Sequence, residues 1–309
     1  MKKSLYTAAC LLLLSFLLLF PSEALAAARD GMSLWLNTLV PVLLPFLILT
    51  GILVHTGQVE KLLSPLSRLW RSLFGLSPWG VYVFLLGSFC GCPMGPKLAR
   101  DLCVQGRLSK REASYLLTFT GSPSPVFLIT YLGGVCLKGR VSPFVILGLL
   151  LSSNLLTMVF FRFFVFRNKT WDPAEEFFPK KETPAKGSTG AILDVSIMNG
   201  FETITRLGGY ILLFSILSAA VSHFWPFSLL GKCVLLGFLE LTTGLHQLSA
   251  ALLSPWQTWF LSMVMAAFGG FCIMAQTKSV LDGDLSIIPY ASAKCVNALF
   301  MAVLLLMTV

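Results

Sequence analysis

The feature that most constrains the fold is a 17-residue apolar stretch, Gly80 to Pro96, that ends in GSFCGCPMGP. Basic clusters flank it, and basic residues favour the cytoplasmic side of a membrane. The stretch is broken by Gly and Pro, so we predict a hairpin that enters and leaves on one side. Irregular backbone at membrane depth is tolerated only where protein or a polar cavity surrounds it. The sequence therefore predicts a path for a solute through the protein. The flanking basic residues are Lys61, Arg68 and Arg71 before the stretch and Lys97, Arg100, Arg107, Lys110 and Arg111 after it.

Composition assigns the chain to the membrane. Hydrophobic residues make up 56% of the 309 positions, only 12% are charged, and the mean hydropathy is +0.80. Soluble domains carry about 25% charged residues. We therefore expect an all-α polytopic membrane protein that contacts lipid. The net charge of +9 follows from basic cytoplasmic loops, so we expect no nucleic-acid binding.

The chain divides into four parts. The apolar N-terminal run is either a cleaved signal peptide or a first span, and we choose the span because a second apolar segment follows at once. The long polar stretch is a cytoplasmic linker. The parts are 1–33 (first transmembrane segment), 34–166 (first repeat), 167–195 (linker) and 196–309 (second repeat).

The two repeats are expected to have inverted topology. A shift of 149 residues carries Phe119 onto Phe268 and Gly121 onto Gly270, and carries Gly91 onto Glu240. An odd number of crossings per half inverts the second half, as in secondary transporters whose site lies at the midplane among broken helices. We expect two re-entrant hairpins (80–96 and 227–253) and about seven crossings: 5–26, 34–55, 113–137, 141–162, 207–223, 255–278 and 286–309.

Glu240 is the one acidic residue that these segments place in the membrane interior. An ionisable group there is costly, which makes it a functional candidate. It binds either the solute or a coupling proton or cation, or else it is a structural partner of the chain break. Thr242 and Thr243 follow it, as hydroxyl residues do at the start of a half-helix.

The first hairpin and the two breaks supply the other candidates. Glycines let the backbone approach a ligand, and the positive end of a half-helix attracts an anion. Lys97 adds a charge to such an end, or else extends to the cytoplasm. The breaks at 121–125 and 269–272 bind substrate or serve helix packing. The predicted substrate contacts are Ser88, Gly91, Pro93, Gly95, Lys97, Gly121, Ser122, Ser124, Glu240, Thr242, Thr243, Gly270 and Gln276.

Several weaker signals remain. Cys90 and Cys92 either pack or hold a soft metal, and we expect packing because no third ligand is close in sequence. Lys294 and Asn297 reach either a polar cavity or the interface. Motifs of metallopeptidases and serine hydrolases are missing from the sequence. We therefore expect no catalysis, no metal site and no cofactor, and a homo-oligomer is compatible with the sequence.

Four segments carry a resemblance to a known family. LWLNTLVPVLLPFLILTGIL (34–53), GCPMGPKLARDL (91–102), GRLSKREASYLLTFTGSPSPVFL (106–128) and LLGFLELTTG (235–244) resemble the sporulation integral membrane protein family. That family carries the nucleoside-recognition or Gate domain and is related in arrangement to concentrative nucleoside transporters. Relatives often have Asn where this chain has Gly121.

The resemblance implies a role in endospore formation. It implies transport of dipicolinate from the mother cell toward the forespore, by an integral protein of the mother-cell or outer forespore membrane with a cytoplasmic N-terminus. The family hairpin positions would be Gly91, Pro93, Gly95, Lys97 and Glu240. A small carboxylate suits two half-helix ends and a basic residue. The alternatives are a nucleoside or metal-ion permease and a sporulation membrane scaffold without transport.

Overall fold

The computed structural model describes residues 2–56, 70, 74–167 and 189–308. Within these ranges the chain is helical and has no strand, which confirms the all-α class. Three members of the first basic cluster, Lys61, Arg68 and Arg71, lie outside the described residues, as does most of the predicted linker.

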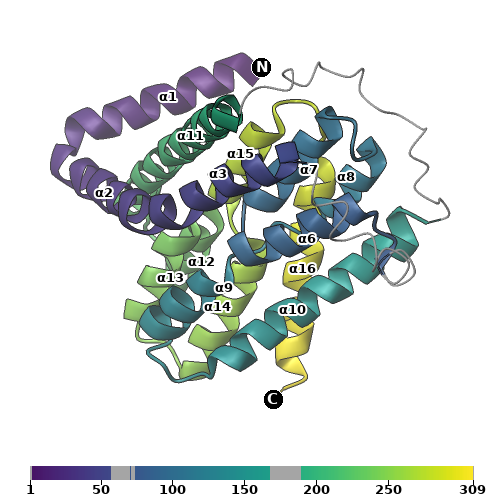
Figure 1. Ribbon diagram of the computed structural model, residues 1–309. Coiled ribbons are helices and arrows are strands. Elements are labelled where there is room, and N and C mark those ends of the chain that lie inside the picture. Colours follow the sequence, from purple (N-terminus) through teal and green to yellow (C-terminus); the bar gives the residue numbers. More distant parts are fainter. Residues whose placement is uncertain (1, 57–69, 71–73, 168–188, 309) are drawn as a thin grey trace.

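The first half contains a helical hairpin followed by a broken helix (Figure 1). The first predicted hairpin is α6 and α7, with a break at residues 91–93. The predicted break at 121–125 is longer than expected, because residues 117–124 are all non-helical. The elements are α1 (Lys2–Leu19), α2 (Pro21–Leu34), η1 (Trp35–Leu39), α3 (Val40–Thr56), α6 (Pro78–Cys90), α7 (Met94–Val104), α8 (Lys110–Leu116), α9 (Pro125–Phe127), η3 (Leu128–Cys136), α10 (Pro143–Phe160) and η4 (Phe161–Val165).

The second half repeats this order. The second predicted hairpin is α12 and α13, which meet at Glu240, and the broken helix is α14 and α15, which are separated by two glycines. Helix α11 begins at Thr189, so residues 189–195, which we assigned to the linker, are helical. The elements are α11 (Thr189–Phe224), α12 (Leu229–Leu239), α13 (Leu241–Ala250), α14 (Pro255–Phe268), α15 (Phe271–Leu281) and α16 (Ile288–Leu306).

Helices α2 and α3 form one continuous antiparallel partner of α11, joined by the π-helical turn η1 (Figure 1). Small residues allow this close approach: Gly31 lies against Ser215, and Gly51 lies against Ser196. Between these contacts, the Trp35 indole donates a hydrogen bond of 2.8 Å to the carbonyl of Ile204. The loop expected between the first two crossings is therefore helix.

Four helices among the described residues are long and apolar enough to cross a membrane: Pro143–Val165, Gly190–Phe224, Pro255–Leu281 and Ile288–Leu306. A fifth span is possible where Cys10–Leu19 and Pro21–Asn37 meet at a bend of 111°. The other expected crossings are shorter or interrupted helices. Large apolar side chains face outward, such as Phe144 with 85% of its surface exposed, which fits lipid contact. The chain is a polytopic membrane protein.

The two hairpins enter the molecule from opposite ends. The last turns of α7 share a cavity with the start of α11 and the end of α15. The end of α13 shares a different cavity with the end of η3 and the start of α14. Because α14 and α15 run from the second of these regions to the first, the regions lie at opposite ends of the bundle. This geometry agrees with two inverted halves.

Candidate functional site

The first hairpin is held against the first broken helix by backbone contacts. The Cys92 N–H donates to the Ser122 carbonyl at 2.9 Å. A Cβ on Gly91 would lie 2.5 Å from the Ser124 nitrogen, and one on Gly95 would lie 2.3 Å from the Thr120 carbonyl oxygen. Only glycine allows such approaches. Pro93 forms the N-cap of α7 in the same break.

In the second half a hairpin also packs on a helix break, through different contacts. A Cβ on Gly244 would lie 2.1 Å from the Cα of Gly237, so α12 and α13 touch through their backbones. A Cβ on Gly270 would lie 3.3 Å from the Gly237 carbonyl oxygen. Each hairpin tip therefore packs on the break of the helix that follows it.

Both hairpin tips, the first helix break and α15 line one cavity of about 120 Å³, the central cavity. Four predicted contacts line it: Ser124, Glu240, Thr242 and Gln276. Tyr131 also lines it, and its hydroxyl donates to the Thr242 carbonyl at 3.1 Å. Most of the remaining lining is apolar, as is usual for small-molecule sites with a few placed polar groups. The volume is below the roughly 150 Å³ of an apolar cavity that holds benzene, so the space is no larger than one small ring needs.

Glu240 caps the N-terminus of α13 with its side chain. One carboxylate oxygen accepts the Thr242 N–H at 3.1 Å. The other accepts the Thr243 N–H at 2.7 Å, the Thr243 hydroxyl at 2.8 Å and the Thr242 hydroxyl. With 5% of its surface exposed, the carboxylate is stabilised by the helix end and by these donors. Glu240 is therefore a structural partner of the chain break at the hairpin tip, and it also lines the central cavity.

A chain of polar side chains continues from the first break to α16. The Ser122 hydroxyl donates to the Asn154 side-chain oxygen at 2.9 Å. The Asn297 amide donates to the same oxygen at 2.9 Å and to the Ala267 carbonyl at 3.3 Å. Ser122 was predicted from the break. Asn154 was missed, although a polar amide within the apolar run 143–160 was a usable signal.

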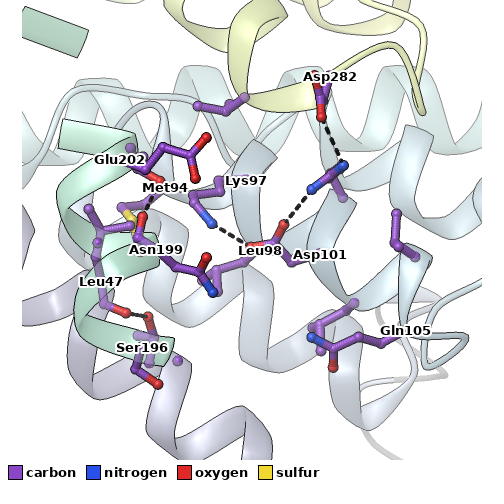
Figure 2. Close-up of a pocket in the computed structure, with 18 of the residues that line it drawn as sticks. Leu47, Met94, Lys97, Leu98, Asp101, Gln105, Ser196, Asn199, Glu202 and Asp282 are labelled. Carbon is purple, nitrogen blue, oxygen red and sulfur yellow. Dashed lines mark hydrogen bonds and ion pairs between the residues drawn. The ribbon is translucent and has the colours of Figure 1, made fainter. Parts of the chain in front are cut away.

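The other nine predicted contacts do not line the central cavity, and Ser88, Lys97 and Gly121 among them have other surroundings. Ser88 is in the last turn of α6 and lines none of the cavities described here. Lys97 lines a cavity of about 360 Å³ at the end of α7, where its ammonium pairs with Asp101 at 2.6 Å (Figure 2). Gly121 is at the first break, but the Tyr290 ring covers it: a Cβ there would lie 2.3 Å from that ring.

A second acidic side chain is buried at the base of the first hairpin. Glu112 has 3% of its surface exposed, and its side chain accepts the Ser77 N–H at 2.7 Å. The contact joins α8 to the start of α6 and therefore steadies the base of the first hairpin.

The chain is similar to a sporulation membrane protein. It is 26% identical over 322 residues to the sporulation integral membrane protein YlbJ of Bacillus subtilis (strain 168). The match covers 93% of this chain and 78% of the relative. No protein-family model and no solved structure matches this chain. With 93% of this chain covered, the match includes both hairpins and both broken helices.

Proposed function

We propose that this protein is a sporulation-associated transporter that moves a small anionic solute through the central cavity. Dipicolinate, moving from the mother cell toward the forespore, is the substrate we favour. The observation that carries the proposal is that two hairpin tips, the first helix break and the second broken helix meet around one cavity. Broken helices at such a point are the usual setting of a transporter's substrate site.

The lining supports an aromatic carboxylate. Apolar side chains and the Phe127 and Tyr131 rings offer a surface for a flat ring. The Ser124 hydroxyl and the Gln276 amide are placed to bind polar substituents. The cavity is no larger than one small ring needs, so a ring with two carboxylates requires the hairpins to move apart. This is the motion that alternating access requires.

Charge distribution gives the orientation. Lys97, Arg100, Arg107, Lys110 and Arg111 gather at the end of the bundle where α7 ends, and basic residues favour the cytoplasm. We therefore place that end in the mother-cell cytoplasm. The N-terminus is placed there as well, because the end of α1 contacts the opposite end of α11 through Phe16, Phe20 and His223.

Glu240 is the proposed coupling site. Its carboxylate holds the first turn of α13 together. Protonation or cation binding would withdraw part of that cap and loosen the hairpin tip. Glu240 alone would then couple the binding of an ion to the motion of the hairpin.

The test is transport itself. Purified protein in liposomes should take up labelled dipicolinate, and liposomes without protein should not. Deletion of the gene in its own host should lower the dipicolinate content of spores, and the wild-type gene should restore it. Uptake of nucleosides or metal ions in place of dipicolinate would overturn the substrate assignment. Absence of any solute flux, together with a bound protein partner, would favour a scaffold.

A further inference from the structure

We propose that Lys294 is the residue that binds a carboxylate group of the transported anion. The inference rests on the proposed function, because it assigns the counter-charge that the anion meets when the hairpins move apart. Lys294 lies in α16, only 5% of its surface is exposed, and it does not line the central cavity in this structure. Its contacts are with the second broken helix and with Tyr290 of its own helix.

Contacts with the second broken helix and with the Tyr290 ring fix the position of Lys294. Its Cε lies 4.0 Å from the point where a Cβ on Gly269 would stand, which places it at the second broken helix. Its Nζ lies 5.5 Å from the centre of the Tyr290 ring, and that ring packs on Gly121 of the first broken helix.

Nothing in the described part of the chain neutralises this ammonium. Among those residues it has no hydrogen bond and no ion pair, and its one polar contact is with the Tyr290 ring. A buried charge is strongly unfavourable unless it is paired. Buried charges that lack a protein partner at membrane depth are found along substrate and ion pathways.

The acidic side chains of the two hairpins and of the loop after α15 already have partners. Glu240 accepts four hydrogen bonds from Thr242 and Thr243. Asp101 and Asp284 pair with Arg100. An external carboxylate is therefore the group that suits Lys294, and one helical turn further along α16 the Asn297 amide begins the polar chain to Ser122.

The experiment measures binding and stability in detergent, apart from transport. The probes are dipicolinate, pyridine-2-carboxylate and the neutral pyridine-2,6-dicarboxamide. We expect both acids, but not the diamide, to bind the wild-type protein and raise its Tm. Lys294→Gln should weaken binding of the acids about tenfold or more, as expected for loss of a buried charge partner. Lys294→Arg should retain most of it. Lys278→Gln, which removes an exposed lysine of α15, is the matched control and should change nothing.

Stability of the free protein separates a binding role from a structural one. Lys294→Met keeps the length of the side chain and removes an unpaired buried charge, so the Tm without ligand should rise. A fall in Tm for Lys294→Met, or unchanged acid binding by Lys294→Gln, would overturn the proposal. If acids bind through Lys294 but liposomes show no dipicolinate flux, the proposed function fails while this inference stands. If liposomes take up dipicolinate and the uptake does not depend on Lys294, the proposed function stands and this inference fails.

Discussion

Gly91 lies so close to Ser124 that a Cβ on the glycine would stand 2.5 Å from the serine nitrogen. The backbone of Gly91 has φ 82° and ψ −171°, a combination that is nearly restricted to glycine. Two separate constraints therefore hold glycine at the tip of the first hairpin. One is the local backbone, and the other is the contact with the first broken helix.

Gly91→Ala should destabilise the protein and abolish transport. The backbone strain costs about 1–3 kcal/mol, and forced contact with Ser124 adds about 1–3 kcal/mol. Gly139→Ala is the matched control, because Gly139 also has positive φ, at 69°, but a Cβ there meets nothing within 4 Å. Thermal unfolding in detergent and liposome uptake measure both variants. Equal loss of stability in the two would show that the Ser124 contact is unimportant.

Glu240→Gln should abolish coupled transport and leave membrane insertion intact. In glutamine an NH2 group replaces one of the two acceptor oxygens, which weakens the cap of α13 by about 1 kcal/mol. The glutamine side chain also cannot take up a proton. Thr243→Val is the control, since it removes one hydroxyl donor and keeps the carboxylate. We expect Thr243→Val to retain partial uptake. Normal uptake by Glu240→Gln would refute the coupling role.

Arg100 joins the first hairpin to the end of α15. Its guanidinium pairs with Asp284 at 2.6 Å and with Asp282 at 3.3 Å. Arg100→Gln should lower the free energy of unfolding by about 1 kcal/mol, because these pairs are partly exposed. Arg206→Gln breaks a more exposed pair with Glu202 and should change stability by less than about 0.5 kcal/mol. Thermal unfolding in low and high salt compares the two variants. If high salt does not reduce the loss of stability in Arg100→Gln, the ion pairs are not its cause.

The sequence was informative wherever the chain is interrupted. Gly and Pro mark the tip of the first hairpin and the first break, two glycines mark the second break, and Glu240 followed by two threonines marks the tip of the second hairpin; the structure has an interruption at each. It was less informative where local signals conflict with packing. The polar residues between the first two apolar segments suggested a loop, yet this region is helical because Gly31 and Trp35 pack against α11.

Partners of buried polar groups could not be read from the sequence. Lys294 and Asn297 are one helical turn apart in α16, yet Asn297 is fully engaged and Lys294 has no partner of opposite charge among the described residues. The difference depends on which distant residues face α16. Glu240 shows the same limit: its position was predicted, but the number of donors around it was set by the geometry of the break.

The inverted arrangement makes a prediction about sidedness. Because α7 ends at one end of the bundle and α13 at the other, cysteines placed near these ends should react from opposite sides of the membrane. We expect Lys110→Cys and Asp282→Cys to be labelled only from the cytoplasmic side, and Lys138→Cys and Leu252→Cys only from the other side. Cys10 and Cys295, the exposed native cysteines of the described chain, are first replaced by Ser.

Labelling with a membrane-impermeant thiol reagent, in intact cells and in inverted vesicles, measures this sidedness. The pair formed by Lys110 and Asp282 is the critical one, because these residues belong to different halves and must share a side if the halves are inverted. Leu252 is fully exposed, at 100%, so failure to label it from outside cannot be attributed to burial. Labelling of Lys110→Cys and Leu252→Cys from the same side would contradict the inverted repeat, and with it the route through the central cavity.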